Sequence, residues 1–418
     1  MKLAKKLLCA IAAPVLAIAL PLSASAQGLI RDAEIEATLR SYADPLFEAA
    51  GLKPSDVNIY IVQDDTINAF VAGGQNLFMN TGTIMEVENP EQLKGVMAHE
   101  TGHIAGGHNA TSDQMMSAAG GTQLITMGLG ALALLAGAPD AALALFGSSS
   151  QFGLMTLFKF SRNDESQADQ YGLDFLEKTG QSADGLVSFM NHFRYEELMS
   201  EARRDPYFRT HPITSERIRA MMKRASEITA KSHPQSKEDI EALAMMKAKL
   251  VGFIGPPARV LSKYPSTDQS IYGKYARAIA AYRATDIKVA LTGVDELISM
   301  KPDDPYFWEL KGQILFESGR TLESIAPHRR SVDLAPKQPL LKVNLARSLA
   351  AQKDKTCPGE PEGPMTDCLK EAEGLLMDAI ALEKDNAFAW NQLADVYGKE
   401  GRTPDADLAT AEEAYALG

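Results

Sequence analysis

The stretch GVMAHETGHIAGGHNA, residues 95–110, contains three histidines, and it decides what kind of domain this chain can form. On a helix, His99 and His103 lie one turn apart on the same face, so both imidazoles can bind one metal ion. Glu100 lies beside them and can accept a proton from a water molecule activated at the ion. The H-E-x-x-H spacing therefore predicts a helix that carries a metal site, and it leaves the third ligand open.

His108 is the nearest candidate for that third ligand. In the longer pattern H-E-x-x-H-x-x-G-x-x-H the third histidine would fall at residue 109, which is Asn109 here. On a continuing helix His108 lies five residues beyond His103, or roughly 140° around the axis. We therefore expect His108 to face away from the ion and to be structural or solvent-facing.

A better candidate lies in the segment FSRNDESQADQYG, residues 160–172. Glu165 and Asp169 are four residues apart, so both lie on one helix face, where Glu165 can bind the metal and Asp169 can hold the far nitrogen of a ligand histidine. Acidic residues in this first turn could instead simply favour the helix dipole. His192, in an amphipathic stretch, is a weaker competitor for the third ligand.

The first 26 residues have the features of a secretory signal peptide. Three lysines precede an apolar run, and Ala24-Ser-Ala26 is a small-x-small cleavage site, so we expect cleavage after Ala26 and a periplasmic location. Cleavage removes three lysines and no acids, which moves the net charge from −12 to −15. Such an acidic exported protein is a poor candidate for nucleic-acid binding.

Two cysteines, Cys357 and Cys368, remain after cleavage, and their closeness in an oxidising compartment predicts one disulfide. A second unusual stretch, residues 114–158, is largely uncharged but interrupted by glycines and serines. Its apolar parts are too short to cross a bilayer, so we expect buried helices or, alternatively, a hairpin that contacts a membrane surface or guards the site.

The remaining patterns divide the chain into two halves. Residues 31–50 are amphipathic and helical, and residues 57–81 predict three strands with a turn at Gly73-Gly74. From about residue 241 the chain is helical, and Pro302 and Pro336 are 34 residues apart. The segment beginning at Trp390 matches the tetratricopeptide pattern W-x-x-L-G/A-x-x-Y. The period and this motif predict four stacked helix pairs. One of the pairs is expected to carry an inserted loop near residues 353–364, tied by the disulfide.

Three segments together resemble the exported zinc metallopeptidases of the HtpX-like family, peptidase family M48: VMAHETGH, SRNDESQADQYG and THPITSERI. The resemblance covers nearly the whole mature chain. It implies one zinc ion held by His99, His103 and Glu165, with Glu100 as the general base and Asp169 in an orienting role.

The resemblance also implies a role for the His-Pro loop at His211. In repeat-bearing relatives this histidine binds the metal and keeps the peptidase inactive, so His211 is expected to be a fourth ligand or a hydrogen-bond donor to the transition state. Arg217 is expected to make a structural ion pair, for which an acid of the site is the candidate partner. The segments Asn68-Ala69-Phe70 and Asn80-Thr81-Gly82 are similar to the family's edge-strand segment, along which an extended substrate can pair.

The expected fold is α+β and mainly α: a signal peptide (1–26), a zincin-like metallopeptidase domain with a small sheet (27–235) and an all-α tetratricopeptide-repeat domain (236–418). The expected function is that of a periplasmic zinc endopeptidase of the H-E-x-x-H-plus-Glu type, also a chaperone, that degrades stalled or misfolded outer-membrane proteins. The resemblance implies the barrel-assembly machinery as a partner of the repeats. The alternative is a repeat scaffold or chaperone whose metal site is largely silent.

Overall fold

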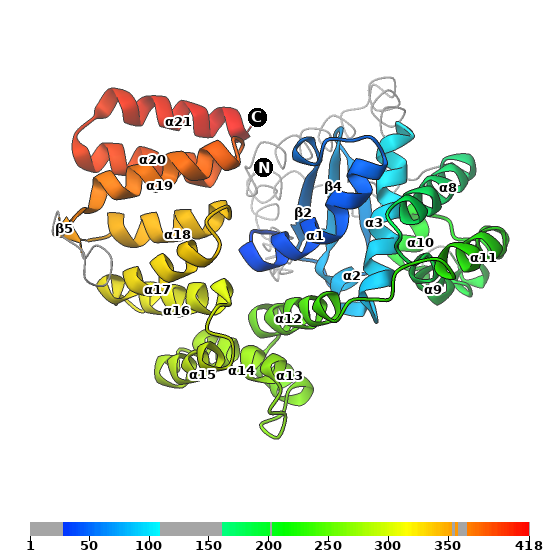
Figure 1. The fold of residues 1–418 in the computed structure, drawn as a ribbon, viewed down its shortest axis with the longest axis horizontal. Helices are drawn as coiled ribbons and strands as arrows, with labels where there is room; N and C mark the ends of the chain where they lie inside the picture. The colour runs from blue at the N-terminus through cyan, green and yellow to red at the C-terminus, as the bar shows by residue number, and fades with distance from the viewer. Residues whose placement is uncertain (1–27, 109–160, 201–202, 353–355, 358–365, 418) are drawn as a thin grey trace, which may run out of the picture.

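The computed structural model of the chain describes residues 28–108, 161–200, 203–352, 356–357 and 366–417 (Figure 1). The expected signal peptide and the uncharged stretch at 114–158 lie outside the described residues. No helix within the described ranges is both long enough and apolar enough to span a membrane. The architecture is mainly helical with a small sheet, as the sequence patterns predict.

A four-stranded sheet lies at the centre of the first half, in the order β1-β2-β4-β3. Its strands are β1 (Leu29–Ile30), β2 (Asn58–Val62), β3 (Ala69–Ala72) and β4 (Asn76–Asn80). The pair β2 and β4 is parallel, whereas β1 and β3 run antiparallel to their neighbours. Gly73 and Gly74 have φ of 57° and 89°, which lets β3 turn directly into β4. Thus β3 forms one edge of the sheet, while β4 is an interior strand, so only the first of the two expected edge segments lies at an edge.

The helices of this half carry the candidate site; some pack against the sheet, and the others pack on those helices (Figure 1). They are α1 (Ala33–Ala49), α2 (Thr81–Glu86), α3 (Pro90–Ala105), α8 (Arg162–Lys178), α9 (Asp184–His192), α10 (Pro206–Thr210) and α11 (Ser215–Thr229), with short 3-10 turns at Pro54–Asp56 and Glu196–Leu198. One apolar core joins the inner face of the sheet to α1, α3, α8 and α9, through residues such as Ile61, Leu77, Leu39 and Val96.

The second half consists of helix pairs that stack in an arc beside the sheet domain (Figure 1). They are α14 (Ile271–Arg283) with α15 (Ile287–Met300), α16 (Pro305–Glu317) with α17 (Thr321–Leu334), α18 (Pro339–Ala350) with α19 (Cys368–Leu382), and α20 (Ala387–Glu400) with α21 (Thr403–Leu417). Trp308 and Trp390 are equivalent: each indole Nε1 donates to the carbonyl six residues earlier, at 2.8 and 3.1 Å. Two short strands, β5 (Thr356–Cys357) and β6 (Thr366–Asp367), lie between α18 and α19.

Two further helices, α12 (Lys237–Ile254) and α13 (Pro257–Lys263), connect the halves. One face of α12 contributes Leu243, Met246 and Leu250 to the core of the sheet domain. Its opposite face contributes Met245, Ala248 and Val251 to the core of the first repeats. Because α12 is buried on both sides, it belongs to both halves, although the expected boundary at 235/236 assigns it to the repeats alone.

Candidate metal centre

Helix α3 presents the H-E-x-x-H residues. Asn89 caps the helix by accepting a hydrogen bond from the Gln92 amide at 3.0 Å, and Pro90 supplies the first helical residue. His99, Glu100 and His103 have no solvent exposure. The sequence thus forms a helix that buries three polar side chains, which requires that they find partners.

Helix α8 supplies the acidic residues and runs close to α3. Ser161 and Asp164 form a reciprocal capping box that fixes its start. The two helices approach through glycine: a Cβ placed on Gly102 of α3 would lie 2.6 Å from the carbonyl oxygen of Ala168. This close contact brings Glu165 and Asp169, which are both buried, against the histidine face of α3.

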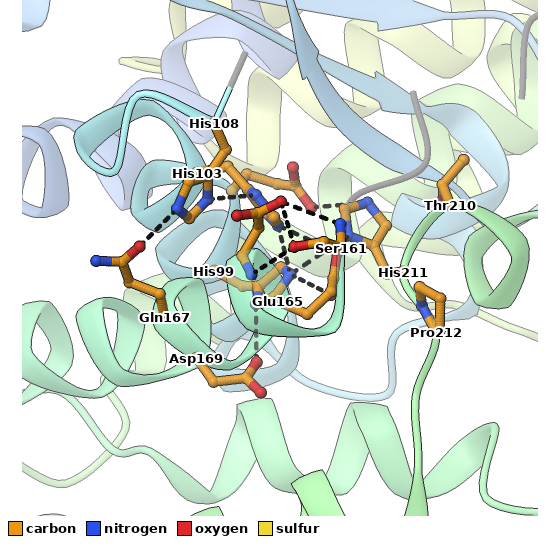
Figure 2. Close-up of polar contacts among 12 residues, drawn as sticks. His99, His103, His108, Ser161, Glu165, Gln167, Asp169, Thr210, His211 and Pro212 are labelled. Carbon is orange, nitrogen blue, oxygen red and sulfur yellow. Dashed lines mark hydrogen bonds and ion pairs between the residues drawn. The ribbon is translucent and has the colours of Figure 1, made fainter. Parts of the chain in front are cut away.

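The third element is the short helix α10, which ends at His211. Asp205 caps it by accepting from the Tyr207 amide at 2.9 Å, and the Tyr207 ring stacks on the His211 ring with centroids 4.7 Å apart. His211 has no solvent exposure. The cap and the stacking hold the imidazole pointing inward, toward α3 and α8 (Figure 2).

Four side chains converge at the centre of the site: His99, His103, Glu165 and His211 each offer one ligand atom, and these atoms lie within 4.8 Å of one another. Nε2 of His103 is 3.2 Å from Nε2 of His99, and Nδ1 of His211 is 3.4 Å from the same His99 atom. Oε1 of Glu165 lies 3.0 Å from Nδ1 of His211.

The outer nitrogens of two imidazoles show which atoms carry protons. His99 Nδ1 lies 3.0 Å from Oδ1 of Asp169, and His211 Nε2 lies 3.1 Å from the carbonyl oxygen of Ala69. Both outer partners are acceptors, so both outer nitrogens carry the proton, and the inner nitrogens of neutral rings present lone pairs. Lone pairs and a carboxylate that face each other across such short distances repel unless a cation lies between them. The residues present therefore fit a divalent metal ion, and two or three imidazoles with one carboxylate suit zinc.

The pKa values of His103 and Glu165 agree with ligand roles for these two residues. Burial lowers the pKa of His103 to about 3, so this ring is neutral and available as a ligand. Burial opposes ionisation of Glu165, but His211 and Arg217 outweigh it and hold the pKa of Glu165 well below its ordinary value. Arg217 reaches Glu165 Oε2 and Asp169 Oδ1, each at 2.7 Å, so it pairs with both acids of α8.

Neither carboxylate oxygen of Glu100 has a hydrogen-bond partner among the described residues. The closest ionisable contact is His211 Nε2, 3.5 Å from Glu100 Oε1. Burial raises the pKa of Glu100 to about 8, and a bound cation nearby would act in the opposite direction. A buried carboxylate without a partner, beside a cluster of ligands, is placed to accept a proton from a reactant.

The two other histidines considered for the third ligand position lie in different surroundings. His192 is exposed and its ring packs edge-on against Phe193, so it lies apart from the cluster. Of the two alternatives expected for His108, structural or solvent-facing, the structure agrees with the first: His108 is not among the four clustered ligands, its side chain is only 5% exposed, and its Nδ1 lies 3.0 Å from Nδ1 of His103. The helical extrapolation fails because α3 ends at Ala105 and Gly107 adopts a positive φ of 65°, which turns the chain back toward the site.

The sequence patterns did not predict two other groups that contact histidines of the site. The carbonyl of Ala69 is a backbone group, and no side-chain pattern points to it. Gln167 lies between Glu165 and Asp169, and its Oε1 is 2.9 Å from Nε2 of His108. The only signal in the sequence was its place on α8, two residues from each acid. Far from this site, Cys357 and Cys368 form a disulfide beside the start of α19.

Comparison with known proteins finds one matching family profile and several similar curated proteins. Residues 30–225 match the sequence profile of peptidase family M48. The chain is 25% identical over 403 residues to the beta-barrel assembly-enhancing protease of Escherichia coli K12, covering 93% of this chain and 77% of that relative. It is 27% identical over 203 residues to the metalloprotease LoiP of the same organism, covering 47% of this chain and 72% of the relative.

Among solved structures, yeast Tom70 matches with a TM-score of 0.35 and 14% identity, over 70% of this chain and 60% of that chain. MamA from Desulfovibrio magneticus matches with a TM-score of 0.34 and 13% identity, over 42% of this chain and 93% of that chain. These scores are too low to support an argument, so the assignment depends on the sequence matches. Residues 30–225 are thus similar to peptidase family M48, and the curated relatives that the chain matches are proteases.

Proposed function

We propose that this chain is a periplasmic zinc endopeptidase, and also a chaperone, that acts in the quality control and assembly of outer-membrane β-barrel proteins. The observation that supports this most directly is the buried convergence of His99, His103, Glu165 and His211 beside the unpartnered carboxylate of Glu100. The substrate class is suggested by the beta-barrel assembly-enhancing protease, to which the chain is similar over 93% of its length.

In the proposed site His99, His103 and Glu165 would hold one zinc ion per chain, which is the H-E-x-x-H-plus-Glu arrangement of gluzincins. When bound, zinc would polarise the scissile carbonyl and lower the pKa of the attacking water. Glu100 accepts the proton of that water and returns it to the leaving amine. Asp169 fixes the tautomer of His99, and Arg217 holds Glu165 and Asp169 in place.

His211 regulates access to this site in the proposal. Its Nδ1 approaches both His99 and Glu165, so the ring takes the fourth ligand position that a reactant would need. Its Nε2 contacts the carbonyl of Ala69 on the edge strand β3. Withdrawal of His211 would free the fourth position and, in the same movement, a backbone acceptor to which an extended substrate can pair.

The repeats complete the proposal. Residues 27–235 form the peptidase domain, and residues 236–418, with the disulfide Cys357–Cys368 beside an inserted loop, form the partner-binding domain. Stacked helix pairs provide an extended concave surface, which we assign to the barrel-assembly machinery or to unfolded barrel substrates. Residues 1–26 act as a cleaved signal peptide, and residues 114–158 are a candidate contact with the membrane surface.

The test is cleavage of casein and of an unfolded outer-membrane β-barrel protein by the mature, zinc-loaded chain. His211→Ala should cleave faster than the wild type, because the fourth position is open. Adding Glu100→Gln to that variant should reduce cleavage by about 10²- to 10⁴-fold, because the general base is lost. Zinc content and thermal melting control for metal retention and folding.

The alternative, a scaffold or chaperone with a largely silent metal site, predicts a different outcome. In that case a folded, zinc-loaded His211→Ala variant would cleave neither substrate. Suppression of barrel-protein aggregation would then be the same in the wild type and in Glu100→Gln.

A further inference from the structure

His103 has an outer partner of a different kind from those of His99 and His211. Its Nδ1 faces Nδ1 of His108 at 3.0 Å, and Nε2 of His108 faces Oε1 of Gln167 at 2.9 Å (Figure 2). The amide nitrogen of Gln167 in turn lies 3.3 Å from the hydroxyl of Tyr171. A continuous chain of polar contacts therefore runs from His103 on α3 back to α8.

The backbone is built to bring His108 into this chain of contacts. Gly106 ends α3, and Gly107 takes a left-handed conformation that other residues rarely adopt. A Cβ on Gly106 would lie 2.5 Å from Nε2 of His108 and 2.7 Å from its Cε1. The imidazole lies directly against the Gly106 backbone, so a side chain there would collide with the ring.

The direction of the protons follows from what His103 must do. To present the Nε2 lone pair at the centre of the site, His103 must carry its proton on Nδ1. A bare Nδ1 of His108, 3.0 Å away, can accept that proton; the proton of His108 then lies on Nε2 and is donated to Oε1 of Gln167. Each group in the chain has one role, and the carboxamide oxygen of Gln167 determines the orientation of the whole.

We propose that His108 and Gln167 form a positioning relay that holds the tautomer and the ring orientation of His103. This inference rests on the proposed metal site. Helix α8 then serves the centre in three ways: Glu165 as a ligand, Asp169 directly behind His99, and Gln167, through His108, behind His103. Neither His108 nor Gln167 contacts the reacting atoms, so both are positioning residues.

A neutral relay has a physical advantage at this position. The site already buries Glu100, Glu165 and Asp169, and among the described residues the cation that pairs with its acids is Arg217. A carboxylate in the buried position of His108 would add another buried negative charge, which is costly without a further partner. The imidazole and the carboxamide orient the ring without that charge.

The experiment measures zinc affinity in the full mature chain by competition with a chromogenic chelator, and the melting temperature of each metal-free variant. His108→Phe keeps a ring but cannot accept a proton from His103, and Gln167→Met keeps the length of the side chain but removes the acceptor. Partners of this kind contribute roughly 10- to 100-fold to metal affinity. We expect the zinc dissociation constant to rise by about that factor in His108→Phe and by a smaller factor in Gln167→Met. Gln167→Glu keeps an acceptor oxygen, so its zinc affinity should lie closer to that of the wild type.

The melting temperature of the metal-free protein separates positioning from general stability. A relay requires that the metal-free Gln167→Met variant melts like the wild type although its zinc affinity is lower. The relay is overturned if both variants bind zinc as the wild type does, or if affinity falls only in variants whose metal-free form is also destabilised. If the wild type itself binds no zinc, the proposed function fails rather than the relay.

Discussion

Two buried polar clusters in the described part of the chain balance their charges in opposite ways. The metal centre is one. The other, which we call the Lys249 cluster, comprises Lys249, Asp32, Glu34, Glu309 and Tyr275 and lies where the peptidase domain meets the repeats. Lys249 is only 2% exposed, and its Nζ lies 2.8 Å from Asp32 Oδ2, 3.3 Å from Glu34 Oε2 and 3.7 Å from Glu309 Oε2.

Every carboxylate of the Lys249 cluster also has a hydrogen-bond donor from the chain. Tyr275 donates to Glu34 at 2.8 Å, the Asn344 amide donates to Glu309 at 3.1 Å, and the Ile35 amide donates to Asp32 at 2.9 Å. At the metal centre Glu100 has no such donor, and imidazole lone pairs face one another. The Lys249 cluster has its own cation at the centre, so we interpret it as structural. The acceptors of the metal centre converge without an internal cation between them, so we interpret this cluster as arranged for a cation from solution.

The first prediction, with the largest expected effect, is removal of the metal from the first cluster. A chelator should abolish proteolysis and lower the free energy of unfolding by about 4 kcal/mol relative to protein in a thousandfold excess of zinc over its dissociation constant. Thermal melting with and without chelator measures the shift, and Glu165→Gln, which lacks a ligand, should respond much less. An identical melting temperature with and without zinc would contradict the proposed role of the first cluster.

The second prediction removes the internal cation of the other cluster. Lys249→Met should cost about 3 to 5 kcal/mol in urea unfolding, because it leaves two buried acids and one partly buried acid without their cation. Zinc affinity should remain at the wild-type value, because the metal centre is untouched. Lys301→Met is the matched control: Lys301 pairs with Glu241 at 2.9 Å on the surface, and its loss should cost less than about 1 kcal/mol. Equal costs for the two variants would show that Lys249 is not needed for charge balance.

The two clusters also differ in how far the sequence predicts them. Local patterns predict α3 from the Asn89-Pro90 start and its histidine spacing, and they predict the Glu165–Asp169 face of α8, because these relations lie within one helix. The strands and the Gly73-Gly74 turn follow from equally local signals. The repeat helices follow from the 34-residue period, and the left-handed Gly319 and Gly401 end equivalent helices.

What the sequence could not predict depends on contacts between distant segments or on backbone geometry. The Lys249 cluster joins α1, α12, α14 and α16, and no spacing relates Asp32 to a lysine 217 residues later. The position of His108 depends on one left-handed residue, Gly107, which breaks the helical extrapolation. The contact of His211 with Ala69 involves a backbone carbonyl, for which side-chain patterns carry no information.

The last prediction, with the smallest expected effect, uses pH to examine the acids around Lys249. Burial raises the pKa of Glu34 to about 7 from its ordinary 4.5, despite the nearby Lys249. The folded protein therefore holds this proton more tightly than the unfolded chain, so the stabilising contribution is complete below about pH 4.5 and is lost as the pH rises through 7.

Glu34→Gln resembles the protonated form and retains an oxygen to accept the Tyr275 hydrogen bond. The variant and the wild type should therefore melt alike at pH 5, whereas at pH 8 the variant should melt roughly 1 to 3 °C higher. Glu241→Gln, at an exposed ion pair, controls for general effects of charge and should show no such change with pH. A wild type that gains stability relative to Glu34→Gln between pH 5 and 8 would mean that Lys249 outweighs burial and keeps Glu34 ionised. The Lys249 cluster would then be a set of full ion pairs rather than one cation shared among partly protonated acids.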